Sequence, residues 1–151
     1  MIKRSLEVLW AIRGEVLIYP AVVIVGSFFY PLVVRIFGLL GTDPKWYASS
    51  CSLPVVALIA SFSTMSDLLN PKGLRKAILT WPSYAGYRSV VQSSIALYVL
   101  ALFMMATGAY VVVASHRPFG LLVMVGAASQ TAFTFTTLHL ASWKSREILT
   151  E

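Results

Sequence analysis

Residues 90–115 of the chain read VVQSSIALYVLALFMMATGAYVVVAS, and none of them is charged. As a helix this stretch is about 39 Å long at a rise of about 1.5 Å per residue. It is therefore longer than the hydrocarbon core of a membrane, which is roughly 30 Å thick. Three further apolar stretches lie at residues 16–40, 46–69 and 119–143. The sequence predicts one all-α integral membrane domain over residues 1–151, with four transmembrane helices.

Two prolines interrupt the first predicted span. Pro20 and Pro31 each follow a tyrosine. Proline has no backbone N–H and its ring clashes with the preceding helical turn. We therefore expect each proline to kink the helix or to end a turn.

The composition excludes a soluble enzyme domain. Hydrophobic residues make up 58% of the chain and charged residues 12%, whereas a soluble domain carries about 25% charged residues. Cys51 is the only cysteine, so the chain cannot form an intrachain disulfide. This excludes quinone-linked disulfide oxidases, which need cysteine pairs. We expect Cys51 to be a small buried thiol in the second span.

The basic residues predict the orientation in the membrane. Nine of the twelve fall in segments that four spans place on one side: Lys3, Arg4, Arg13, Lys72, Arg75, Lys76, Arg88, Lys144 and Arg146. Arg35, Lys45 and Arg117 fall on the other side. Because basic residues concentrate on the cytoplasmic side, we expect both termini in the cytoplasm, most simply at a bacterial inner membrane. The net charge of +6 then reflects insertion and attraction to anionic lipid, and no nucleic acid is expected as a partner.

Two segments have the pattern of helices that lie in the membrane interface. Residues 1–15 place apolar side chains on one face and basic ones on the other, although a polar lead-in to the first span is the alternative. In the second loop a short helix can start at Pro71 and end at Pro82. Its basic residues are Lys72, Arg75 and Lys76. We expect these three to form a cytoplasmic interface with lipid headgroups.

The titratable residues do not fit the common membrane cofactors. His116 is in the predicted outer loop and His139 is near the inner end of span four, so one chain cannot give both axial ligands to one haem. Glu15 and Asp67 lie near the cytoplasmic surface, whereas a proton-coupled antiporter needs an acid well inside a span. We expect no catalytic residues, no cofactor and no metal site.

Polar residues instead follow one face of two spans. Span two contributes Ser61 and Thr64, and span four contributes Gln130, Thr134 and Thr137. An amide near the membrane centre must hydrogen-bond to another helix or face water, because an unpaired polar group in lipid is costly. These five residues are candidates for a pore lining or for a packing surface between helices.

The last hundred residues resemble the phage exclusion protein RexB family. The resemblance comprises the order of span two, the basic stretch Lys72–Lys76, span three, a short outer loop, Ala128-Ser129 in span four, and the closing Lys144-Ser145-Arg146-Glu147. It implies a prophage-encoded inner-membrane channel that depolarises the cell when a second protein signals infection. The family has no sharply defined catalytic motif, so the resemblance assigns no functional residues here.

Two functions remain open from the sequence. The first is a small oligomeric inner-membrane channel or membrane-depolarising effector that acts in phage exclusion or abortive infection. Its partner would be a soluble activator. Several copies must then surround the pore, because four helices are too few to enclose a wide one. The second is a non-catalytic accessory or structural subunit that packs against other membrane subunits.

Overall fold

The computed structural model describes residues 17–69 and 84–150, and this part of the chain is helical without any strand. The helix Leu17–Phe28 comes first. The helices that follow are α2 (Tyr30–Leu40), α3 (Pro44–Ser50), α4 (Leu53–Leu69), α6 (Tyr84–Ser115) and α7 (Phe119–Thr150). The predicted interfacial helices at residues 1–15 and 71–82, with Lys72, Arg75 and Lys76, lie outside the described residues.

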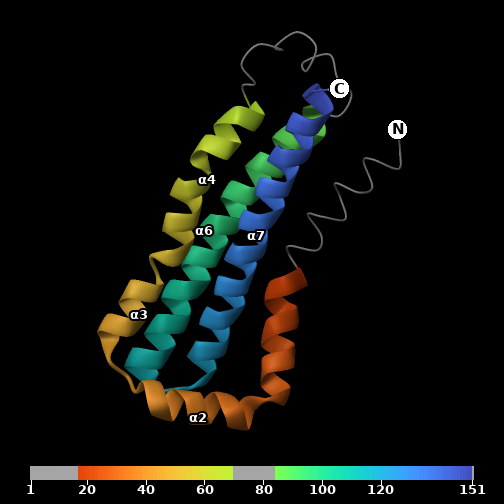
Figure 1. Cartoon of the computed structure of the whole chain (residues 1–151). Coiled ribbons are helices and arrows are strands. Elements are labelled where there is room, and N and C mark those ends of the chain that lie inside the picture. The colour runs from red at the N-terminus through yellow and green to blue at the C-terminus, as the bar shows by residue number, and fades with distance from the viewer. Residues whose placement is uncertain (1–16, 70–83, 151) are drawn as a thin grey trace.

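Three segments are long and apolar enough to cross a membrane. They are Pro44–Ser66, Val91–Ser115 and Phe119–Trp143, which lie close to three of the four predicted spans. α4, α6 and α7 pack side by side along their length (Figure 1). Their outer surface carries large exposed apolar side chains such as Phe62 and Phe103. A surface of this kind suits lipid rather than water. The predicted all-α class is confirmed for the described residues, together with three helices of membrane-spanning length and apolar composition.

The first predicted span is bent. The chain turns by 92° between Leu17–Phe28 and α2, so residues 16–40 form no straight helix. Pro31 stands at the start of α2, where its missing N–H breaks the hydrogen-bond ladder, and Phe29 leaves the helical geometry with φ −100° and ψ 24°. The bundle therefore has three spans, or four if the bent pair counts as one.

α2 lies across one end of the bundle, which we call the α2 end (Figure 1). Val33 is its buried residue and Phe37 packs against the core. Gly41 ends α2 with φ +68°, a backbone conformation that glycine adopts without strain. Asp43 then caps α3, because its carboxylate accepts a hydrogen bond from the Lys45 amide at 3.0 Å.

Pro44–Ser66 is a single span with a break. α3 ends at Ser50 and α4 starts at Leu53, whereas the sequence predicts an uninterrupted helix over residues 46–69. The physical reason is Pro54, which has no N–H to donate to the carbonyl of Ser50. Within the break, the hydroxyl of Ser52 donates to the carbonyl of Ser49 at 2.6 Å.

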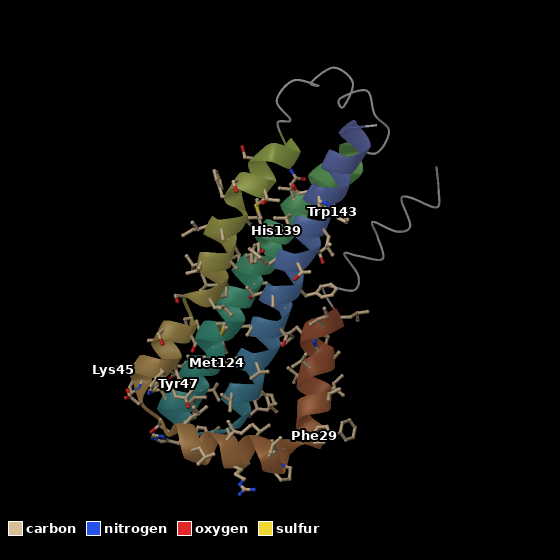
Figure 2. All side chains as sticks on the ribbon, in the orientation of Figure 1. Phe29, Lys45, Tyr47, Met124, His139 and Trp143 are labelled. Atoms are coloured by element: carbon tan, nitrogen blue, oxygen red, sulfur yellow. The ribbon has the colours of Figure 1, made fainter. Side chains whose placement is uncertain are left out.

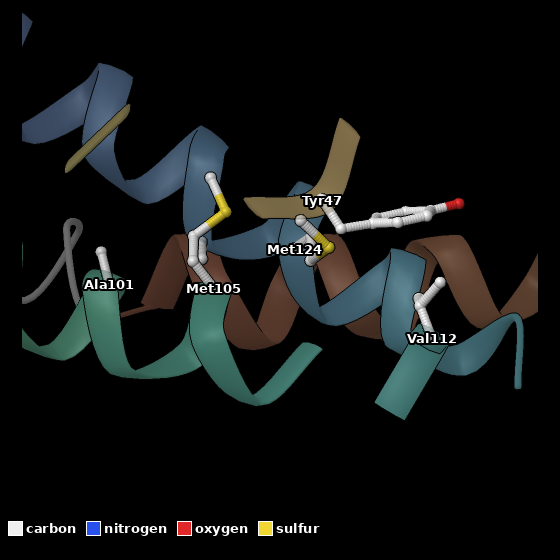
Figure 3. Packing of buried hydrophobic residues seen from close by; sticks show 6 residues of the cluster. Tyr47, Ala101, Met105, Val112 and Met124 are labelled. Atoms are coloured by element: carbon white, nitrogen blue, oxygen red, sulfur yellow. The ribbon is translucent and has the colours of Figure 1, made fainter. Parts of the chain in front are cut away.

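Two apolar clusters form the core, one near each end of the three-helix bundle. The cluster at the α2 end contains Tyr47, Ala101, Met105, Val112, Met124 and Ala127 (Figure 3). The second cluster contains Met65, Val91, Tyr98 and Leu138. Where the two clusters meet, buried polar residues of α4, α6 and α7 lie inside the bundle.

Glycines allow the closest helix contacts. Gly108 of α6 lies against Gly120 of α7, so that a methyl group at Gly108 would be 2.7 Å from the carbonyl oxygen of Gly120. Between Leu17–Phe28 and α7 the glycines lie against side chains, with Gly26 against the side chain of Leu122. A methyl group at Gly126 would be 3.0 Å from the Tyr19 ring. The contact between Gly108 and Gly120 brings two backbones together, as small residues do in membrane helix pairs.

Candidate functional site: a polar layer inside the bundle

Six polar side chains gather inside the three-helix bundle with almost no solvent exposure, and we call them the polar layer. They are Ser61 of α4, Ser94 and Tyr98 of α6, and Gln130, Thr131 and Thr134 of α7. The Ser61 hydroxyl and the Tyr98 hydroxyl are hydrogen-bonded at 3.0 Å. This bond joins α4 to α6 in the middle of the bundle.

Two atoms of the polar layer have no hydrogen-bond partner among the described residues. They are Oε1 of Gln130 and Oγ1 of Thr134, which stand one helical turn apart on α7. The neighbouring Thr131 is satisfied, because its hydroxyl donates to the Ala127 carbonyl at 2.8 Å. A buried oxygen without a partner costs about 1–3 kcal/mol. Each of these two oxygens can therefore accept a hydrogen bond that the described residues do not supply.

The structure divides the five candidate lining residues into two groups. Ser61, Gln130 and Thr134 are buried inside the bundle of one chain. Thr64 and Thr137 are only half-buried. The stripe thus faces the neighbouring helices of the same chain, and these helices fill the space beside it.

Sequence reasoning missed Tyr98 and Ser94. Both lie in span three, which is otherwise strongly apolar. They are one helical turn apart, on the same face of the helix. Tyrosine prefers the membrane interfaces. A tyrosine in the middle of a span was therefore a signal for a buried hydrogen bond.

Hydroxyls on the outside of the helices are satisfied within their own helix. Ser27 donates to the Val23 carbonyl at 2.7 Å, and Thr107 donates to the Phe103 carbonyl at 2.8 Å. Thr136 bonds in the same way to the carbonyl four residues earlier. Such back-bonding leaves no donor that needs water. The exterior therefore suits lipid or apolar helix surfaces.

The histidines lie at different places along the bundle. His116 is exposed in the turn between α6 and α7, with φ +50°. His139 is exposed on α7 towards the end opposite Lys45 and Tyr47 (Figure 2). Its ring packs on Phe135 with centroids 4.1 Å apart, and its Nδ1 is 3.0 Å from the Phe135 carbonyl. In residues 17–69 and 84–150 no three histidine, cysteine or acidic residues come close enough to hold a metal ion.

Cys51 is half-buried at the break between α3 and α4, where it packs against the core cluster around Tyr47. The expected thiol is thus only partly covered.

A second candidate site is a cavity of about 310 Å³ at the α2 end. α3 contributes Trp46, Tyr47 and Ser50, and α7 contributes Leu121, Met124 and Ala128. Its walls are mostly apolar, in contrast to the polar layer.

No protein-family model matches the chain, and comparison with curated proteins and with solved structures finds no significant match.

Proposed function

We propose that the chain is a non-catalytic subunit of a larger membrane protein complex, which acts by packing against partner helices. The observation that carries this proposal is that the side chains of the polar layer point into the chain's own bundle. Ser61, Tyr98 and Gln130 are buried inside the chain's own bundle, where the Ser61–Tyr98 bond joins two helices. They act as inter-helix hydrogen-bonding groups.

The exterior supports the same role. Its hydroxyls are back-bonded, and Phe62 and Phe103 are more than two-thirds exposed. In lipid there is no hydrophobic force between helices, so partners associate by close packing of such surfaces. In this proposal the bent pair counts as a fourth span and both termini are cytoplasmic. The basic residues Lys72, Arg75 and Lys76 then meet headgroups or a cytoplasmic partner.

Photo-crosslinking tests this proposal. A photoreactive amino acid in place of Phe62, which is 71% exposed, should crosslink to a different membrane chain in native membranes. The same amino acid in place of Met65, which is 3% exposed on the same helix, is the matched control and should give no intermolecular product. Equal products from both positions, or no partner other than lipid at Phe62, would contradict the proposal.

The second candidate function is a small oligomeric channel or membrane-depolarising effector of a bacterial inner membrane. It is favoured by Gln130 Oε1 and Thr134 Oγ1, which are buried without a partner among the described residues and can each accept a hydrogen bond. The resemblance to the phage exclusion family points in the same direction. In this case several copies assemble and a soluble activator opens the path.

Ion flux from liposomes that hold the purified protein distinguishes the two functions. A channel should conduct, and Gln130→Leu should reduce the flux because the variant removes the central amide. Ala132→Leu, at an exposed position on the same helix, is the control and should conduct like the wild type. Absence of flux in the wild type in the presence of the activator, or a Gln130→Leu variant that conducts equally well, would exclude the channel.

A further inference from the structure

We propose that the cavity at the α2 end binds one acyl chain of an anionic phospholipid, with the headgroup beside Lys45 and Arg117. This is a binding site separate from the polar layer. It does not depend on whether the chain is a packing subunit or a channel.

The chemistry of the walls selects an apolar occupant. The hydroxyl groups in the lining already have hydrogen-bond partners. The Tyr47 hydroxyl donates to the Gly41 carbonyl at 2.7 Å, and the Ser50 hydroxyl donates to the Trp46 carbonyl at 2.9 Å. Water needs two to four polar partners to stay in a cavity, and apolar cavities remain dry or take apolar ligands. The cavity is therefore unsuited to water.

The size of the cavity fits a chain of methylene groups. A volume of about 310 Å³ holds roughly ten groups of about 30 Å³, the space that a water molecule takes in the liquid. The lining from Leu121 to Ala128 extends about 10 Å along α7 at 1.5 Å per residue. A long, narrow ligand matches these dimensions.

The location gives lipid access. α2 runs at 92° to Leu17–Phe28, so when that helix stands along the membrane normal, α2 lies in the plane of the interface. The cavity is on the bundle side of α2. Its rim residues Leu40, Trp46 and Val125 are all exposed apolar side chains, and tryptophan favours the headgroup level. An acyl chain can therefore enter from the surrounding leaflet.

The charge around the cavity favours an anionic headgroup. Three basic residues, Arg35, Lys45 and Arg117, are exposed at the α2 end, and none of them forms an ion pair with a described residue. The one described acid there is Asp43, whose carboxylate caps α3 by accepting the Lys45 amide. Lys45 directly precedes the lining residue Trp46 in the sequence. Figure 2 shows Lys45 next to Tyr47, which also lines the cavity. The Lys45 ammonium group is therefore free for a phosphate.

Quenching of tryptophan fluorescence by brominated lipid tests the site. The chain has four tryptophans, and two single-tryptophan variants are compared, one that keeps Trp46 and one that keeps Trp143. These two side chains are 67% and 66% exposed, so a brominated lipid without net charge quenches them alike through ordinary contact. Trp143 has Lys144 and Arg146 beside it in the sequence, so each tryptophan is compared with itself across variants when the lipid is anionic. Trp46 lines the cavity, whereas Trp143 lies towards the opposite end of the bundle (Figure 2).

The protein is placed in phosphatidylcholine vesicles with a small fraction of brominated phosphatidylglycerol. We expect brominated phosphatidylglycerol to quench Trp46 at a lower lipid fraction in the wild type than in Ala128→Leu. The preference of the Trp46 site for this lipid over phosphatidylcholine should be about fivefold for each basic residue that contacts the headgroup. Brominated phosphatidylcholine of the same chain length should give a smaller difference. Lys45→Gln should reduce the preference for the anionic lipid.

Ala128→Leu fills the cavity, so it should leave the quenching of Trp143 as it is and weaken the quenching of Trp46. Ala132→Leu, one turn further along α7 and exposed, should leave it unchanged. Circular dichroism in detergent establishes that both variants fold. Quenching of Trp46 that Ala128→Leu does not weaken, or an equal loss of quenching at Trp46 and Trp143 in that variant, overturns the proposal. Weaker quenching of Trp46 than of Trp143 by both lipids also overturns it, because a protein partner or a second copy then covers the cavity.

Discussion

A methyl group at Gly108 would collide with the backbone of the neighbouring helix. In Gly108→Ala the new Cβ would be 2.6 Å from Cγ of Met124 and 2.7 Å from the carbonyl oxygen of Gly120. The Met124 side chain can rotate away, because methionine is flexible. The Gly120 carbonyl is part of α7, so relief there requires the two helices to separate by several tenths of an ångström.

Two opposing terms set the size of the effect. Overpacking of a tight contact costs about 1–3 kcal/mol, and the replacement of glycine by alanine inside a helix contributes about 1 kcal/mol of stability. We therefore expect Gly108→Ala to lower the free energy of unfolding by about 1 kcal/mol. Gly38→Ala adds the same methyl group where no atom lies within 4 Å, and it should be neutral or stabilising.

Reversible unfolding in mixed detergent, followed by far-ultraviolet circular dichroism, measures these differences. Ala106→Gly, at an exposed position of α6, gives the helix-propensity term in the same helix and should destabilise by about 1 kcal/mol. If Gly108→Ala stabilises the protein by as much as Ala106→Gly destabilises it, propensity alone accounts for the effect. The close contact between α6 and α7 would then be refuted.

Further predictions concern the polar layer and the orientation. A double-mutant cycle of Ser61→Ala and Tyr98→Phe should give a coupling energy of about 0.6–1.7 kcal/mol, the range measured for hydrogen bonds between membrane helices; additive effects would contradict the bond. Thr134→Val should leave the free energy of unfolding unchanged or raise it, because it removes an unpaired buried hydroxyl. Thr131→Val should lower it by about 1 kcal/mol, since that hydroxyl donates to a carbonyl; equal losses would refute this distinction. A reporter fused to the C-terminus should be active in the cytoplasm, and activity only outside would reverse the orientation.

Three of the predicted spans agree with the structure within a few residues because span length is a local property. The uncharged stretch 90–115 corresponds to Val91–Ser115, and 119–143 corresponds to Phe119–Trp143. A run of apolar residues longer than the bilayer needs no knowledge of its neighbours to be identified. Hydropathy alone does not show where the helix breaks inside such a run. Pro54 interrupts the second span, although the apolar run continues through it.

The bend in the first predicted span depends on tertiary packing. Pro31 signals that the helix is interrupted, but proline alone does not fix whether the chain resumes in line or turns. The 92° angle is accompanied by packing of Val33 and Phe37 of α2 against the bundle. These contacts join residues far apart in the sequence, so hydropathy could not reveal them.

The polar layer could be predicted in part. Helical spacing identified Gln130 and Thr134 on one face of α7, and both are buried. What spacing cannot show is which helix covers that face. Sequence reasoning left a pore lining open beside a packing surface, whereas the bond between Ser61 and Tyr98 depends on how α4 meets α6.

The order of the helices along the chain has a consequence for assembly. α4 is synthesised before α6, so Ser61 enters the membrane before Tyr98 exists to bond with it. α6 and α7, joined by the short turn at residues 116–118 and in contact at Gly108 and Gly120, have the local contacts that form fast. This hairpin is then the template on which the earlier helices dock. Until α6 arrives, the Ser61 hydroxyl can bond to a carbonyl of its own helix, as Thr107 does on α6. Docking of α6 then replaces this local bond by the bond to Tyr98.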